Sequence, residues 1–122
     1  MKIYVSHAST YDYENELYAP LSQAFRGEHE VFLPHEADNQ GVYSKDVIAA
    51  SDVMLAEVSF ASTGQGIEIG WAHAAGVPII CLYKSGAKAS GSLRFVADQM
   101  IDYENEADMI DKTEAALARE KQ

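Results

Sequence analysis

Residues 52 to 70 read Asp-Val-Met-Leu-Ala-Glu-Val-Ser-Phe-Ala-Ser-Thr-Gly-Gln-Gly-Ile-Glu-Ile-Gly. This stretch indicates the structural unit that repeats along the rest of the chain. The first part, Val53 to Val58, is apolar almost throughout, which is typical of a central parallel strand covered on both faces. A loop rich in glycine and hydroxyl groups follows from Ser59 to Gly66, and a helix is predicted from about Ile67 to Ala75. Gly76 ends that helix. Strand, loop and helix in this order are the repeating unit of a parallel sheet.

The same alternation continues on both sides of this stretch. The other predicted strands are Ile3–Val5, Glu30–Leu33, Val77–Tyr83 and Met100–Tyr103, and the other predicted helices are Glu14–Arg26, Tyr43–Ala50 and Ala107–Arg119. Strands separated by helices indicate parallel pairing. We therefore expect one α/β domain over residues 1–122, a three-layer sandwich around a five-stranded parallel sheet of the flavodoxin-like or Rossmann-like type.

Composition excludes several classes of partner. The chain has 19 acidic and 9 basic residues and a formal net charge of -10, whereas nucleic-acid polymers and anionic membranes attract basic surfaces. No apolar stretch approaches the roughly 20 residues of a membrane span, and the first residues show no signal peptide. The single cysteine, Cys81, lies in an apolar run, so we expect a buried thiol in a cytoplasmic protein.

The position of a ligand site follows from the expected sheet. Ligands bind outside the carboxyl ends of parallel strands, near the point where the strand order reverses, and this rule selects Ser6–Tyr13, Ser59–Gly66 and Lys84–Ser92. In the middle segment, Gly64 and Gly66 allow a ligand to approach the backbone. Glu68 is expected in the first turn of the next helix, where its carboxylate either acts as a nucleophile or complements the helix dipole.

Asp52–Val58 followed by Ser62–Gly70 resembles the signature of the nucleoside 2-deoxyribosyltransferase family, most of all its branch of 2-deoxynucleoside 5'-monophosphate N-glycosidases. The resemblance continues through Pro78–Leu82 and Ser90–Asp98. It implies an enzyme that cleaves the N-glycosidic bond of a (deoxy)nucleoside or its 5'-monophosphate, by hydrolysis or base exchange. It also implies a small-molecule substrate, no cofactor and no metal ion.

The resemblance assigns roles to single residues. The glutamate that matches Glu68 attacks the anomeric carbon and forms a covalent sugar intermediate, and a second acid, for which Asp46 is the nearest match, assists at the base. The residues expected to contact the substrate are Tyr4, His7, Ser62, Gly64, Gly66 and Ser90. Packing in the sheet is the alternative for Tyr4, and a solvent-facing helix position is the alternative for Asp46. Glu57 is a spare candidate, although carboxylates at strand ends often only anchor neighbouring loops.

The sequence leaves open whether the substrate must carry a 5'-phosphate. Ser62 matches a serine typical of the monophosphate branch, and Ser90 matches a phosphate contact supplied by a neighbouring subunit. That branch also has an arginine in a glycine-rich segment after the first strand, whereas Ser6–Tyr13 contains none. Phosphate recognition normally uses arginine or lysine, and the candidates to replace this arginine are Lys84, Lys88 and Arg94.

Two other hypotheses fit parts of the chain. The altered first loop is compatible with a non-catalytic nucleotide-binding module. Lys2–Ser9 resembles the opening of bacterial TIR domains, some of which cleave NAD, although Gly64–Gly70 fits those domains poorly. The family resemblance also implies a homodimer or a higher homo-oligomer, with Trp71 and the Lys84–Ser92 loop as the expected interface.

Overall fold

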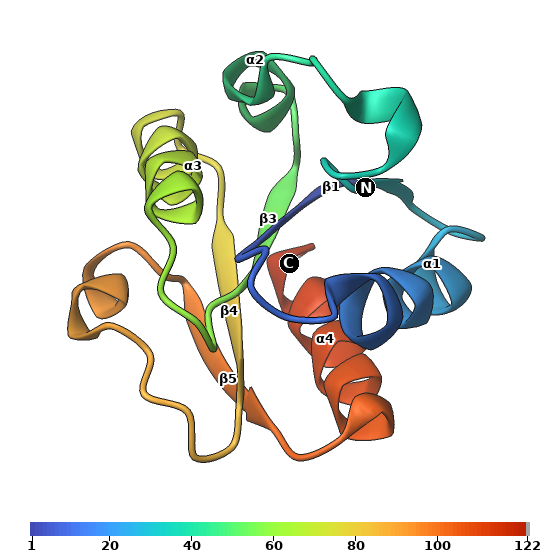
Figure 1. Ribbon diagram of the computed structural model, residues 1–122, viewed down its shortest axis with the longest axis vertical. Helices are drawn as coiled ribbons and strands as arrows, with labels where there is room; N and C mark the ends of the chain where they lie inside the picture. The colour runs from blue at the N-terminus through green and yellow to red at the C-terminus, as the bar shows by residue number, and fades with distance from the viewer. Residues whose placement is uncertain (122) are drawn as a thin grey trace.

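Five parallel strands form one sheet in the order β2-β1-β3-β4-β5 in the computed structural model, which describes residues 1–121 (Figure 1). The strands are β1 (Lys2–His7), β2 (Glu30–Phe32), β3 (Val53–Glu57), β4 (Ile79–Lys84) and β5 (Gln99–Tyr103). Each neighbouring pair is parallel. This strand order is the flavodoxin-like one, so the predicted fold class is confirmed.

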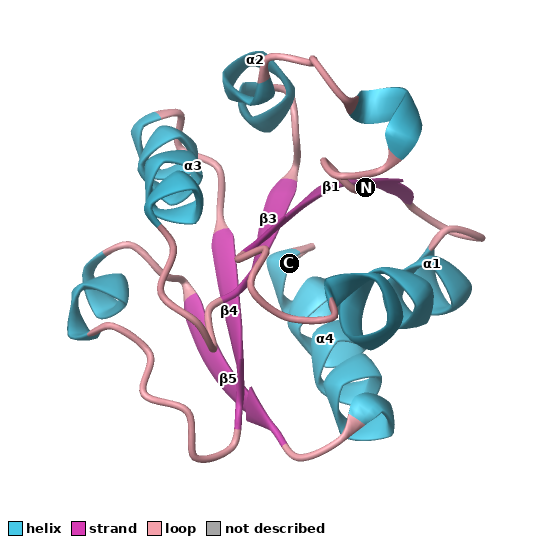
Figure 2. Ribbon diagram, viewed as in Figure 1, coloured by secondary structure: helices cyan, strands magenta, loops and turns pink. Residues whose placement is uncertain are grey.

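Helices cover both faces of the sheet and give the three layers (Figure 2). They are α1 (Ala19–Phe25), α2 (Ser44–Ala49), α3 (Thr63–Ala74) and α4 (Glu106–Glu120), with shorter helical segments η1 (Glu14–Tyr18), η2 (Ala37–Asn39) and η3 (Gly91–Phe95). Apolar contacts join α1 and α4 to one face and α2 and α3 to the other. Within residues 1–121, no helix combines the length and the apolar character needed to cross a membrane.

Each face of the sheet has its own apolar cluster. Along β3, Met54 points into the cluster under α2 and α3, while Leu55 points into the cluster under α1 and α4. This alternation explains why the strand is apolar almost throughout, because both of its faces are covered. Cys81 is fully buried beneath α3, and burial raises the pKa of its thiol to about 12. The predicted core thiol is therefore confirmed.

Helix α3 begins four residues earlier than the sequence analysis predicts. Ser62 is its N-cap residue, and the Ser62 hydroxyl accepts a hydrogen bond from the Gln65 backbone N–H at 3.3 Å. Gly64 is therefore helical, and Glu68 lies in the second turn rather than the first. The prediction of a loop through Gly66 is wrong, because a serine followed three residues later by glutamine is a helix-start signal that outweighs the glycines.

Candidate active site

Two hydroxyl groups of β1 hold the carboxylate of Glu68. Tyr4 donates to Glu68 Oε2 at 2.5 Å, and Ser6 donates to Glu68 Oε1 at 2.9 Å. Tyr4 and Ser6 are two residues apart on one strand, so their side chains point to the same face of the sheet. Because β1 leads to β2 on one side and β3 leads to β4 on the other, this carboxylate lies where the strand order reverses.

Tyr4 is a rigid donor. Its side chain is fully buried, and its ring stacks on Phe32 with 5.4 Å between the centroids. Burial and then the Glu68 carboxylate raise the pKa of the Tyr4 phenol, while Ser44 opposes them. The phenol therefore keeps its proton and continues to donate to Glu68 at neutral pH.

The first turns of α3 leave space for a ligand next to this carboxylate. A β-carbon on Gly64 or Gly66 would meet no atom within 4 Å outside the chain neighbours and the helix backbone. Glu68 is half-buried, and the side chain of the preceding Ile67 is 50% exposed. The helix surface next to Glu68 is therefore open to solvent.

A cavity of about 680 Å³ flanks the same helix on the side of η3. Three residues of the predicted site, Ser62, Gly66 and Ser90, line this cavity, and so does Lys88. Hydroxyl and ammonium groups are donors that bind phosphate oxygens. Ser62 and Glu68 are six residues apart on the helix, or about 9 Å along its axis, and Glu68 itself is not among the residues that line this cavity.

The two other basic candidates are occupied by contacts within the chain. Lys84 forms an ion pair with Glu16 at 2.7 Å, and its ammonium lies 5.2 Å from the centroid of the Tyr11 ring. The Arg94 guanidinium lies 5.0 Å from the centroid of the Phe95 ring. Of the three basic residues singled out from the sequence, Lys88 is the one that lines the cavity with Ser62 and Ser90.

His7 is not brought together with Glu68. Its ring is 5% exposed, its Nδ1 donates to the Ala8 carbonyl at 2.7 Å, and its Nε2 accepts from the Tyr18 hydroxyl at 2.6 Å. Burial lowers the pKa of the His7 imidazole. Alternation along β1 directs His7 to the α1 face, opposite to Ser6. Both of its ring nitrogens are therefore used in packing this end of the sheet.

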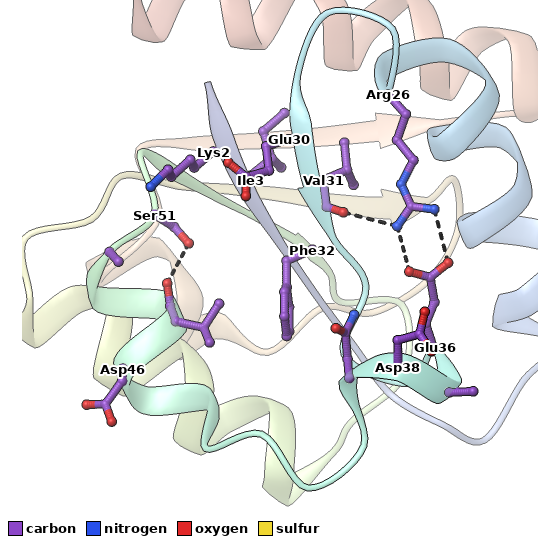
Figure 3. Close-up of a pocket in the computed structure, with 14 residues that line it drawn as sticks. Lys2, Ile3, Arg26, Glu30, Val31, Phe32, Glu36, Asp38, Asp46 and Ser51 are labelled. Carbon is purple, nitrogen blue, oxygen red and sulfur yellow. Dashed lines mark hydrogen bonds and ion pairs between the residues drawn. The ribbon is translucent and has the colours of Figure 1, made fainter.

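Asp46 also lies apart from the Glu68 carboxylate. It is exposed on α2, where it lines a separate cavity of about 850 Å³ between that helix and the β2 edge of the sheet. Figure 3 shows its carboxylate pointing away from Lys2 and Phe32 on the sheet. Within residues 1–121, the side-chain hydrogen bonds to Glu68 come from β1 and not from Asp46. Its role as the second acid stays a prediction.

Glu57 anchors the loop before α3. The Glu57 side chain is 1% exposed, and its carboxylate accepts hydrogen bonds from the Ser59 backbone N–H at 2.6 Å, from the Ser59 hydroxyl at 3.0 Å and from the Tyr103 hydroxyl. Gln65 Nε2 donates to the Glu57 carbonyl at 2.7 Å, which ties the first turn of α3 to the end of β3. These contacts support the loop-anchoring alternative for Glu57.

Ser6 is the residue of this site that the sequence analysis does not assign. It is fully buried, although the predicted first strand ends one residue before it. The signal was the spacing, because a polar residue two positions after Tyr4 shares its face of the strand. Without knowing that α3 packs over that face, the sequence gives no reason to pair Ser6 with Glu68.

The comparison with curated proteins finds a nucleotide hydrolase. The chain is 32% identical to the 5-hydroxymethyl-dUMP N-hydrolase of Rattus norvegicus over 111 residues, which cover 74% of this chain and 68% of the rat protein. No family profile matches the chain.

Two solved structures share the fold over nearly the whole chain. The CMP N-glycosidase of Clostridium botulinum has a TM-score of 0.70 and 23% identity, with 93% of this chain and 99% of that chain covered. A 2-deoxyribosyltransferase of Bacillus psychrosaccharolyticus has a TM-score of 0.65 and 17% identity, with 90% of each chain covered. At these identities the likeness concerns the fold.

Proposed function

This chain belongs to the family of nucleotide N-hydrolases that includes the 5-hydroxymethyl-dUMP N-hydrolase, and we propose that it hydrolyses the N-glycosidic bond of a nucleoside 5'-monophosphate. The observation that carries the mechanism is the Glu68 carboxylate, which Tyr4 and Ser6 hold at the reversal of the strand order. The resemblance to nucleoside 2-deoxyribosyltransferases that the sequence indicates agrees with this family.

Glu68 acts as the nucleophile. One of its carboxylate oxygens forms a bond to the anomeric carbon of the sugar while the bond from that carbon to the base nitrogen breaks, and the base leaves with the electron pair and takes up a proton. Water then attacks the anomeric carbon, gives one proton to solvent and releases the sugar phosphate with the Glu68 carboxylate restored. Two displacements at one carbon retain its configuration.

The 5'-phosphate binds in the cavity on the η3 side of α3. Ser62 and Ser90 of one chain donate hydroxyl hydrogen bonds to its oxygens, whereas the family resemblance implies a Ser90 from the neighbouring subunit. Lys88 supplies the positive charge that the loop after β1 lacks. The overall charge of -10 does not prevent this binding, because the donors act locally. Lys88 therefore distinguishes monophosphates from free nucleosides.

The working unit is a homodimer. Tyr43 is 59% exposed and Ile67 is 50% exposed, and the Tyr43 ring contacts Trp71 edge-on with 5.8 Å between the centroids. These three residues form an apolar surface over α2 and α3, next to Glu68. The proposed interface uses this surface together with the Lys84–Ser92 loop.

The test is base release, followed by chromatography, from a panel of nucleosides, their 5'-monophosphates and NAD. We expect release from one or more monophosphates and a loss of at least a thousandfold in Glu68→Gln, which keeps the size of the side chain and removes the nucleophile. Lys88→Ala should raise KM for the monophosphates without a matching effect on nucleosides. Glu30→Gln, an exposed carboxylate on β2, is the matched control and should keep full activity.

Each alternative gives a different result. Nicotinamide release from NAD alone would support a NAD-cleaving enzyme. Nucleotide binding, seen as a thermal shift, without base release from any substrate would support a non-catalytic binding module. Undiminished release by Glu68→Gln would overturn the nucleophile assignment.

A further inference from the structure

The buried hydroxyl of Ser6 donates a hydrogen bond to the carboxylate of Glu68, the proposed nucleophile. The residue is 0% exposed in the middle of the sheet, on a strand whose other residues facing the same way include the aromatic Tyr4. Its hydroxyl lies 2.9 Å from Glu68 Oε1, 62 residues further along the chain. A buried hydroxyl is unfavourable unless it is paired, so this hydrogen bond accounts for a serine at an otherwise apolar position.

The two donors to Glu68 differ in rigidity. The Tyr4 ring is fixed by burial and by its stacking on Phe32, so it holds Oε2 in one place. The Ser6 hydroxyl turns about a single side-chain bond, so it can release Oε1 without any movement of the backbone. Oε1 is therefore the oxygen that can be freed, and Oε2 is the oxygen that stays bound.

We propose that Ser6 is a positioning residue that aligns the attacking oxygen, Oε1, and releases it when the bond to the sugar forms. The proposal rests on the proposed function and deepens it. When Oε1 becomes the ester oxygen of the intermediate, Oε2 becomes the carbonyl oxygen and continues to accept from Tyr4. When water displaces the ester, the Ser6 hydroxyl turns back and donates to the regenerated carboxylate.

Removal of the hydroxyl tests this role. In Ser6→Ala we expect kcat to fall by at least about tenfold while KM changes by less than about threefold, because the lost donor acts on the nucleophile and not on substrate binding. The pH–rate profile of Ser6→Ala should differ from that of the wild type, because the attacking carboxylate loses a hydrogen-bond donor. Ser6→Thr, which restores a hydroxyl, should recover most of kcat and the original pH profile.

A matched control separates this effect from a general loss of packing. The Ser51 hydroxyl is part-buried and donates to the Val47 carbonyl at 2.8 Å on α2. Ser51→Ala removes a comparable hydrogen bond and should leave kcat and the pH profile unchanged. If Ser6→Ala behaves like Ser51→Ala in both measurements, the inference is overturned.

A second readout does not depend on turnover. In protein labelled with ¹³C at the glutamate carboxyl carbons, the Glu68 signal, assigned from Glu68→Gln, should have a different chemical shift in Ser6→Ala and in the wild type at one fixed pH, because the carboxylate loses a hydrogen bond. An unchanged chemical shift would overturn the inference even if the enzyme assay finds no substrate. Absence of base release by the wild type would instead count against the proposed function. If Ser6→Ala does not fold, Ser6→Cys, which keeps the size and weakens the donor, takes its place in both measurements.

Discussion

His7 is neutral in the folded protein because its ring is buried between β1 and η1. The Nδ1–H group donates to the Ala8 carbonyl, and Nε2 accepts from the Tyr18 hydroxyl, so the neutral ring satisfies both contacts. Burial is the largest effect and lowers the pKa of His7 below its ordinary value of 6.5. The hydrogen bond to the Ala8 carbonyl raises this pKa in part, and the nearby His35 lowers it. A proton that binds the unfolded chain more readily than the folded one destabilises the fold at low pH.

We therefore predict that the free energy of unfolding is lower at about pH 5.5 than at about pH 7.5, and that part of this decrease comes from His7. The stabilisation that comes from burying the neutral His7 ring is fully present above the ordinary pKa of 6.5. It is lost as the pH falls from 6.5 through the lower pKa of His7 in the folded state. Urea unfolding at the two pH values measures it. His7→Asn, which does not titrate, should weaken this pH dependence, and exposed His73→Asn should not. An equal slope in His7→Asn and the wild type would contradict the assignment.

At the residue scale, the sequence predicts the partners of Glu68 in part. Tyr4 and Glu68 were both singled out, and the structure joins them by a hydrogen bond. The sequence predicts a substrate contact for His7 and none for Ser6, although alternation along the strand places Ser6, and not His7, on the same face as Tyr4. The end of a short strand gives no periodicity from which that choice can be made.

Helix α4 carries a buried hydroxyl without a partner. Thr113 is 0% exposed, and its Oγ1 has no hydrogen-bond partner within residues 1–121. An unpaired buried hydroxyl costs about 1–3 kcal/mol relative to a paired one, and valine has the same shape without the hydroxyl. We predict that Thr113→Val stabilises the protein by about 1 kcal/mol and raises Tm by about 3–5 °C.

Calorimetry or chemical denaturation measures this change. Thr113→Ser is the matched control, because it keeps the hydroxyl and loses the methyl group, and it should be less stable than the wild type by about 1 kcal/mol. A Thr113→Val variant that unfolds at a lower temperature than the wild type would show that this hydroxyl has a partner in solution.

At the element scale, the type and order of every strand were predictable, because largely apolar runs of three to seven residues alternate with helical patterns. The boundaries of the elements were less predictable. The start of α3 was missed because Gly64 and Gly66 are poor helix formers, and their cost is offset by the Ser62 cap and by Gln65, which bonds the end of β3. Contacts of that kind depend on the folded sheet and leave no periodic pattern.

At the scale of the whole molecule, the net charge opposes self-association, whereas the exposed apolar surface favours it. Two copies with a formal charge of -10 each repel, whereas the surface of Tyr43, Ile67 and Trp71 favours contact. Salt screens the repulsion and strengthens apolar contact, so we predict that the dimer fraction in sedimentation rises between about 20 mM and 300 mM NaCl. Tyr43→Ser should weaken the dimer, and Met100→Thr, which alters an exposed residue on β5, should not. A monomer at every salt concentration would contradict the proposed homodimer.

The three-layer architecture was predictable at this scale because the strand order of a parallel sheet is limited by short, right-handed connections. The cavity between α2 and the β2 edge of the sheet was not predictable from the sequence. It exists because the ten residues between Phe32 and Tyr43 carry the chain away from the sheet, so that α2 packs beside α3 (Figure 1). A connection of this length has no regular pattern that fixes its path.

The hydroxyl pair on β1 also makes the position of the Glu68 carboxylate depend on contacts that are distant in the sequence. Glu68 receives its hydrogen bonds from residues 64 and 62 positions earlier, across the pairing of β1 with β3. Closing a loop of that length is slow relative to forming α3 itself, because non-local contacts come at a large cost in chain entropy. A partly folded or newly synthesised copy can therefore contain the helix and the glutamate without the two hydrogen bonds that hold the Glu68 carboxylate in the folded protein.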